Sequence, residues 1–141
     1  MAIYIKYLQT ALLIIGLSVL ASVFLVIVAI PVIKGLDSYV IMSKSMEPAL
    51  SCGDIIEVEK IAVNDIAPGN IITVSSGDAK TTFTHRVLYI DTVNGLIYTK
   101  GDANSTQDLY PVKYDKVLGR VVYKVPYAGK LVLSFREGTD E

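Results

Sequence analysis

The distribution of apolar and polar residues divides the chain into an apolar N-terminal segment and a mixed remainder. From Ala11 to Ile33 there is no charged side chain, and only one glycine, two serines and one proline interrupt the apolar run. A helix of this length spans roughly 35 Å, enough to cross a hydrocarbon core of about 30 Å. A cleaved secretory signal has a shorter apolar region, of about 7–15 residues. The pattern therefore predicts a short N-terminal tail over 1–10 and a transmembrane anchor helix over 11–33.

Beyond Lys34 the apolar positions follow the short period of β-strands. Runs of β-branched and aromatic residues are separated by Gly, Pro, Asn and Asp. The expected strands are Tyr39–Met42, Asp54–Glu59, Ile71–Val74, Thr82–Ile90, Leu96–Thr99 and Val117–Val125. Asn94-Gly95 is a strong hairpin signal, so the runs on its two sides are expected to pair. Residues 34–141 are therefore predicted to form one compact, strongly bent antiparallel β domain, which makes the protein mainly β.

Composition and charge exclude several classes of function. The chain has 13 Lys+Arg and 14 Asp+Glu, dispersed along its length, so no basic surface for nucleic acid is expected. A single cysteine, Cys52, excludes an intrachain disulfide. One histidine and one cysteine cannot build an ordinary His/Cys zinc site, and we expect no metal and no cofactor. A last apolar run, Leu131–Phe135, is too short to cross a bilayer, and its role is left open.

The most informative polar residue is the only histidine, His85. It is bracketed by Ser43-Lys44-Ser45-Met46-Glu47-Pro48 and by Lys100-Gly101-Asp102-Ala103-Asn104, with Asp108 just beyond. A hydroxyl, an imidazole and carboxylates in three segments are the parts of an activated serine nucleophile. On an alternating strand His85 shares a face with Phe83 and Val87, whereas Arg86 faces the other way. We therefore expect Ser45 to be the nucleophile and His85 its base.

These segments resemble the type I signal peptidases. Ser45-Met46-x-Pro48 matches the motif around the nucleophile of that family. The bacterial housekeeping branch carries a lysine before Arg-Val, where this chain carries His85. The histidine and the Gly101-Asp102-x-Asn104 stretch resemble the endoplasmic-reticulum and archaeal branch, a Ser-His type also found in sporulating bacteria. The chain departs from the family at Lys44, between the two serines, where a glycine is common.

The resemblance implies a fold, an activity and a set of roles. The fold is a β domain of the signal peptidase/LexA-like type on the extracytoplasmic or lumenal side of a single-pass membrane protein. The activity is that of signal peptidase I, a serine endopeptidase that cleaves signal peptides from exported or secreted precursors after small residues, through a Ser-His-Asp acyl-enzyme. Asp108 would orient His85, with Asp102 as the rival and as structural support, and Ser43 would stabilise the oxyanion. Precursor proteins and the lipid bilayer would be its partners, and partner membrane subunits are left open.

Two alternatives stand beside this interpretation. The first is a catalytically silent, membrane-anchored β module that binds a partner or assembles a complex. The joint presence of Ser45, His85 and Asp108 weighs against it. The second is a peptidase dedicated to a few substrates, and nothing in the residues separates it from an enzyme with a broad range.

Overall fold

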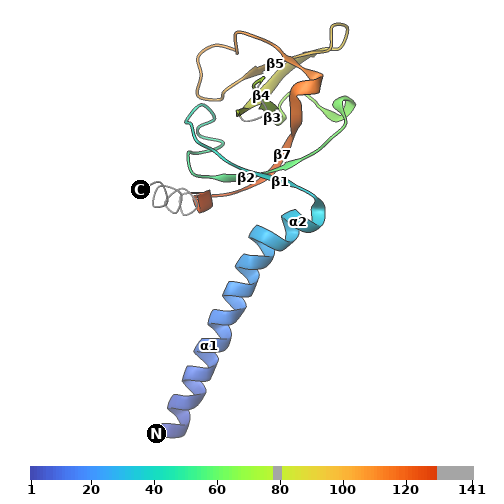
Figure 1. Cartoon of the computed structure of the whole chain (residues 1–141). Helices are drawn as coiled ribbons and strands as arrows, with labels where there is room; N and C mark the ends of the chain where they lie inside the picture. Colours follow the sequence, from blue (N-terminus) through green and yellow to red (C-terminus); the bar gives the residue numbers. More distant parts are fainter. Residues whose placement is uncertain (78–80, 130–141) are drawn as a thin grey trace, which may run out of the picture. The chain divides into compact units, whose positions relative to one another are not determined.

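The computed structural model describes residues 1–77 and 81–129, and it divides into two compact units, Met1–Gly35 and Leu36 onward (Figure 1). The run Leu131–Phe135, singled out above, lies outside the described residues. Each unit is described by itself.

The first unit is helical throughout. Helix α1 spans Ala2–Phe24, a π-helical turn follows over Leu25–Ala29, and α2 spans Ile30–Lys34. Gly35 ends the helix in the left-handed conformation, with φ of 63°. The helix therefore begins well before Ala11, and the residues expected as a tail belong to it. Lysine is a good helix former, so the charge of Lys6 bounds an apolar run without ending a helix.

The helix has the length and composition of a membrane span. Ile3–Phe24 has a mean hydropathy of 2.0, and none of it is buried within the protein. A helix that is apolar on all faces and uncovered suits a lipid environment. Its serine hydroxyls are satisfied locally: Ser18 donates to the Ile14 carbonyl oxygen at 2.9 Å and Ser22 to that of Ser18 at 2.8 Å. Neither serine hydroxyl then needs water.

Among its described residues, the second unit forms a seven-stranded antiparallel sheet, which confirms the predicted fold class. Its strand order is β1-β2-β7-β3-β4-β5-β6. The strands are β1 (Asp37–Val40), β2 (Ile55–Glu59), β3 (Ile71–Ser75), β4 (Thr82–Asp91), β5 (Leu96–Lys100), β6 (Val112–Lys113) and β7 (Val117–Val125). Register shifts interrupt the β2–β7, β3–β7 and β4–β5 ladders, and such bulges bend a sheet.

The hairpin predicted at Asn94-Gly95 is confirmed. Strands β4 and β5 pair from Asp91↔Leu96 to Arg86↔Lys100, and Gly95 has a φ of 66°. The turn contains residues 92–95, and its last residue is left-handed, a conformation that glycine adopts without strain. The hairpin brings the histidine strand beside the Gly-Asp segment that follows β5.

The strand expected over Tyr39–Met42 lies two residues earlier, at Asp37–Val40. Ile41 still exchanges backbone hydrogen bonds at the turn before β2, donating to the Asp54 carbonyl at 2.9 Å and accepting from the Gly53 N–H at 2.8 Å. Gly53 has a φ of 90°, which ends the regular ladder there. The chain can then leave the sheet edge and form the loop that carries Ser45.

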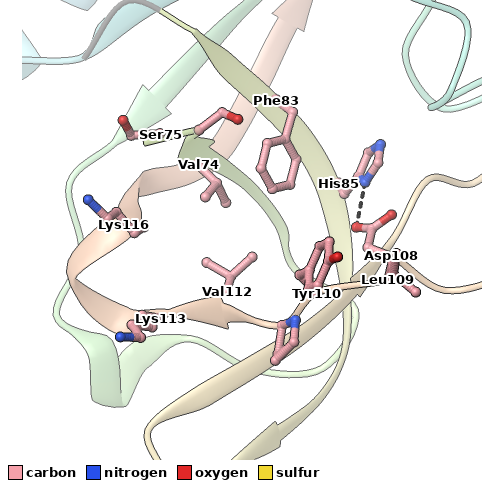
Figure 2. A pocket seen from close by; sticks show the side chains of 12 residues that line it. Val74, Ser75, Phe83, His85, Asp108, Leu109, Tyr110, Val112, Lys113 and Lys116 are labelled. Atoms are coloured by element: carbon pink, nitrogen blue, oxygen red, sulfur yellow. Dashed lines mark hydrogen bonds and ion pairs between the residues drawn. The ribbon is translucent and has the colours of Figure 1, made fainter. Parts of the chain in front are cut away.

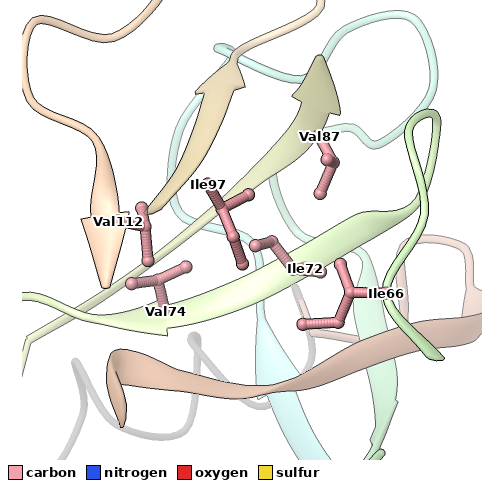
Figure 3. Close-up of a cluster of buried hydrophobic side chains, with 6 residues drawn as sticks. All are labelled: Ile66, Ile72, Val74, Val87, Ile97 and Val112. Atoms are coloured by element: carbon pink, nitrogen blue, oxygen red, sulfur yellow. The ribbon is translucent and has the colours of Figure 1, made fainter. Parts of the chain in front are cut away.

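Two hydrophobic clusters fill the interior of the β unit. One lies under β3, β4, β5 and β6 and is drawn in Figure 3: Ile66, Ile72, Val74, Val87, Ile97 and Val112. The other joins β2 to the loop after β1: Ile41, Met46, Leu50, Ile56 and Val58. The second cluster matters for the site because it anchors the loop that carries Ser45.

Candidate active site

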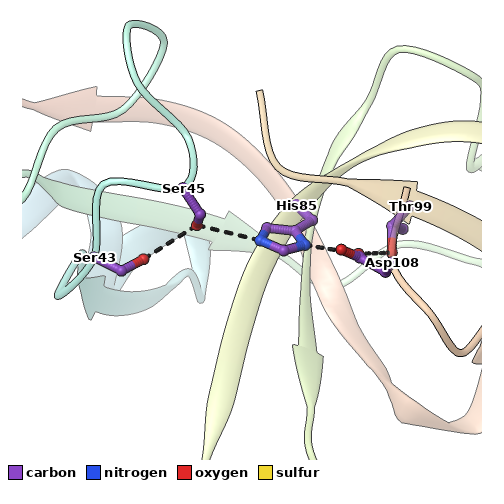
Figure 4. A network of polar contacts seen from close by, with 5 residues as sticks. All are labelled: Ser43, Ser45, His85, Thr99 and Asp108. Carbon is purple, nitrogen blue, oxygen red and sulfur yellow. Dashed lines mark hydrogen bonds and ion pairs between the residues drawn. The ribbon is translucent and has the colours of Figure 1, made fainter. Parts of the chain in front are cut away.

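The structure brings Ser45, His85 and Asp108 into one chain of hydrogen bonds (Figure 4). The Ser45 Oγ lies 3.2 Å from Nε2 of His85, and Nδ1 of His85 lies 2.7 Å from Oδ2 of Asp108. The histidine and aspartate side chains are 13% and 19% exposed, so water has limited access to them. With the proton on Nδ1 facing the carboxylate, Nε2 is left to accept from the serine hydroxyl. This is the geometry that an activated serine nucleophile requires.

The Ser45 segment is held by burial of its neighbours. Met46 is 1% exposed and Leu50 is 3% exposed, both inside the second hydrophobic cluster. The carbonyl oxygen of Ser45 accepts a hydrogen bond of 2.9 Å from the N–H of Ala103. Ser45 is therefore fixed on both sides, by an apolar side chain after it and by the turn that follows β5.

Gly101 makes the second of these contacts possible. A Cβ atom at this position would lie 2.6 Å from the Ser45 carbonyl oxygen and 2.7 Å from the Asn104 side-chain nitrogen. No side chain fits in that space without moving the Ser45 segment. The Gly-Asp-x-Asn stretch therefore has a structural reason to begin with glycine, independent of any charge it carries.

Strand β4 supplies His85 in the register expected from the sequence. Phe83 packs against the imidazole edge to face, with ring centroids 5.4 Å apart, and Val87 on the same face is 1% exposed. On the opposite face Thr84 bonds the Thr73 hydroxyl across the ladder at 2.9 Å. The alternation of the strand therefore aims the imidazole toward Ser45 from an anchored backbone.

Asp108 is held by Thr99, a residue that the sequence did not single out. The Thr99 hydroxyl donates to Oδ2 of Asp108 at 2.6 Å, and the Asp108 N–H donates to the Thr99 carbonyl at 2.9 Å. Thr99 is 1% exposed and lies on β5. Threonine is common in β-strands, so its residue type gave no sign of a role in the site. Its position just before Lys100-Gly101-Asp102 was the one feature that set it apart from other strand threonines.

Asp102 has a different partner. Its two carboxylate oxygens accept from Nε and Nη2 of Arg86 at 2.8 and 2.6 Å, and Nη1 of Arg86 donates to the Gly69 carbonyl at 2.9 Å. The hydrogen bond from Arg86 lowers the pKa of Asp102 below its ordinary value, and the same bond raises the pKa of Arg86. Of the two rival aspartates, Asp108 therefore lies within hydrogen-bond distance of the imidazole, and Asp102 braces the turn after β5 against β4.

Ser43 and Lys44 are the two residues that precede Ser45 in the chain. The Ser43 hydroxyl lies 3.1 Å from the Ser45 hydroxyl, so the two serines face the same space, as expected. Lys44 between them is exposed. The lysine that departs from the family pattern is therefore in contact with solvent.

A buried carboxylate beneath the serine loop was also missed. Asp54, 1% exposed, accepts from the N–H groups of Ser51 and Tyr127 at 3.0 and 3.1 Å and from the Lys124 ammonium at 3.1 Å. Burial alone raises the pKa of Asp54, but these donors together bring that pKa below its ordinary value. Lys124 also donates to the Ala49 carbonyl at 2.9 Å, which ties the loop to β7. Lys124 and Tyr127 are about 70 residues from Asp54 in sequence, so no local pattern predicted these two contacts.

Comparison with known proteins identifies the family. No family model matches the chain. The chain is 37% identical over 91 residues to signal peptidase I W of Bacillus subtilis (strain 168), covering 62% of this chain and 47% of that protein. It is 33% identical over 122 residues to the human protein named "Putative signal peptidase complex catalytic subunit SEC11B", covering 79% of this chain and 74% of that protein. The chain therefore belongs to the type I signal peptidase family, as the resemblance predicted, although it spans only about half the length of the Bacillus relative.

Proposed function

We propose that this protein is a membrane-anchored serine endopeptidase that removes signal peptides from exported precursors, cutting after small residues. The observation that carries the proposal is the hydrogen-bond chain from Ser45 through His85 to Asp108. The family supports it, since both relatives are named as signal peptidases. A catalytically silent module would not need a serine, an imidazole and a carboxylate in this order.

The proposed reaction follows from the positions of the atoms. His85 Nε2 takes the proton of Ser45 as Oγ attacks the scissile carbonyl carbon, and Asp108 stabilises the imidazolium through Nδ1. The Ser43 hydroxyl and the Ser45 N–H are the proposed donors to the oxyanion. His85 then gives its proton to the leaving nitrogen, the C–N bond breaks, and an acyl-enzyme remains on Ser45. Water, deprotonated by the same imidazole, hydrolyses that ester and restores the hydroxyl.

A groove on the acyl side of Ser45 suits an extended peptide. A cavity of about 190 Å³ lies between residues 39–46 and residues 82–84 of β4 and includes Ser43 and Ser45 in its walls. Strand β1 pairs with β2, and residues 82–85 of β4 pair with β3, so both sides of the groove present a backbone edge without a strand partner among the described residues. An extended peptide can add a strand there, and a small cavity favours the small side chains before the cut.

The helix fits a substrate that is itself held in the membrane. A signal peptide carries its own apolar segment, and an enzyme anchored by Ile3–Phe24 meets it in the same bilayer. We place the β unit on the extracytoplasmic or lumenal side, where exported precursors emerge. The human relative is named as the subunit of a complex, so partner membrane subunits are part of the proposal.

The test is cleavage of a labelled precursor by the purified full chain in detergent. Wild type should release a product cut after a small residue, and Ser45→Ala and His85→Ala, both folded, should release none. Lys44→Ala is the matched control, because Lys44 is exposed beside the serine, and it should cut normally. No product from folded wild type against several unrelated precursors would favour the binding module. Cleavage of one precursor alone would favour a dedicated peptidase.

A further inference from the structure

A second and larger cavity is lined by His85 but by no residue of the loop that carries Ser45. Its volume is about 520 Å³, and His85 and Asp108 form part of its wall. Figure 2 shows Val74, Phe83 and Val112 around its middle, with Tyr110 and Leu109 near Asp108. Pockets of this size accept a ligand or a few side chains, and apolar walls favour apolar groups. The proposed acyl half of the substrate does not use it.

The two cavities share one lining residue, and the residues of the candidate site line one cavity or the other. Phe83 lines both, whereas Ser43 and Ser45 line only the smaller cavity, and His85 lines only the larger one. A base that first deprotonates Ser45 and then protonates the leaving nitrogen must lie against the chain on the leaving side of the bond. The residues after the cut therefore have to pass His85, and the larger cavity begins there.

Charge distinguishes the two ends of the larger cavity. The Asp108 carboxylate lies at the His85 end, and Lys113 and Lys116 lie at the opposite end in Figure 2. Within residues 1–77 and 81–129 neither lysine forms an ion pair, and Asp115, between them in sequence, does not line the cavity. An acidic side chain is therefore repelled near His85 and attracted at the far end.

We propose that this cavity is the subsite for the first few residues after the cut, accepting a bulky apolar side chain near Phe83 and then an acidic side chain at Lys113 and Lys116. The inference rests on the proposed function and deepens it, because it makes the mature side of the precursor part of the specificity. Shape and charge act separately here. The apolar walls favour a large side chain on the substrate, and the two lysines favour a negatively charged one.

The test uses one precursor peptide with a fixed signal half and four versions of the half after the cut. Each version carries either leucine or alanine, together with either glutamate or lysine, within the first three positions after the cut. For each peptide, kcat/KM is measured with the full chain in detergent. The leucine–glutamate peptide should be cut fastest. Lys113→Glu combined with Lys116→Glu should shift the glutamate-to-lysine ratio by about tenfold toward lysine, since each exposed charge contact contributes a few-fold.

Two further variants separate the effect from general changes. Lys60→Glu reverses the charge of a lysine outside the cavity whose side chain is 74% exposed. It should leave the glutamate-to-lysine ratio of kcat/KM unchanged. Leu109→Ser removes a side chain that lines the cavity and is 83% exposed, so the variant should still fold. It should reduce the ratio of kcat/KM for the leucine peptide to that for the alanine peptide. Equal rates for all four peptides, or a ratio that ignores the lysine reversal, would overturn the subsite while leaving the peptidase intact. Absence of any cleavage would overturn the proposed function itself and the subsite with it.

Discussion

Replacing Thr99 by valine removes one hydrogen bond to Asp108 and almost no volume. The lost bond is the 2.6 Å contact from the Thr99 hydroxyl to Oδ2, the same oxygen that faces Nδ1 of His85 at 2.7 Å. The backbone bond from Asp108 to the Thr99 carbonyl stays in place. The carboxylate then has one donor fewer to fix its position, and a methyl group lies where the hydroxyl was.

The size of the effect follows from the environment of the bond. Thr99 is 1% exposed, so water cannot replace the lost donor easily. A hydrogen bond to a charged group is worth about 1.5–3 kcal/mol. If that energy holds the carboxylate in its transition-state position, the loss corresponds to about 10–100-fold in kcat. KM should change little, because Thr99 lines neither cavity.

The assay is kcat and KM on the labelled precursor, with denaturation of the same preparations in detergent. Thr99→Ser keeps the hydroxyl and should restore kcat to within about threefold of wild type, given the small cost of one lost methyl group. Thr73→Val is the matched control, because Thr73 is equally buried and bonds Thr84 instead of the site. It should lose stability by a similar amount and keep kcat. Normal kcat in Thr99→Val, or equal losses of kcat in the two valine variants, would refute the positioning role.

Three further perturbations have defined outcomes. Gly101→Ala places a methyl group 2.6 Å from the Ser45 carbonyl oxygen, so both the thermal midpoint and kcat should fall. Asp102→Asn weakens the pair with Arg86. The pKa of Asp102 is lowered in the folded state, so its ionised form stabilises the fold. Above roughly pH 4, the free energy of unfolding of the wild type should therefore exceed that of the variant by about 2 kcal/mol. This difference should vanish as the pH falls through the folded-state pKa of Asp102. An unchanged difference at low pH would contradict that sign. Ser43→Ala should lower kcat by about 10²–10³-fold at constant KM, and a normal kcat would remove Ser43 from the oxyanion site.

The β strands with clear alternation could be predicted from the sequence. Val117–Val125 matches β7, and the expected Thr82–Ile90 differs from β4 by one residue. The order of the strands could not be predicted, because β7 pairs with β2 and β3 through contacts far apart in the chain. The two-residue β6 was also missed, since so short a strand leaves no periodic pattern.

The residues of the candidate site also fall into those that the sequence could predict and those that it could not. The segments that carry Ser45, His85 and Asp108 were recognisable because their residue types are rare together, and the structure brings these three together. Their catalytic roles remain predictions. Thr99 was not recognisable, because its hydroxyl reaches Asp108 nine residues away only after the intervening turn folds back. Gly101 was noted as part of a motif, but its reason, contact with the Ser45 backbone, is visible only in three dimensions.

The most direct test of the account is a double-mutant cycle on kcat with Ser45→Ala, His85→Ala and the two combined. Because serine and histidine act as one unit, each single variant should lose about 10⁴-fold or more and the double variant should be little worse. Losses that multiply would mean that the two residues act independently. Retained cleavage in His85→Ala, together with loss of cleavage in Lys44→Ala, would assign the base to the lysine and contradict the central claim.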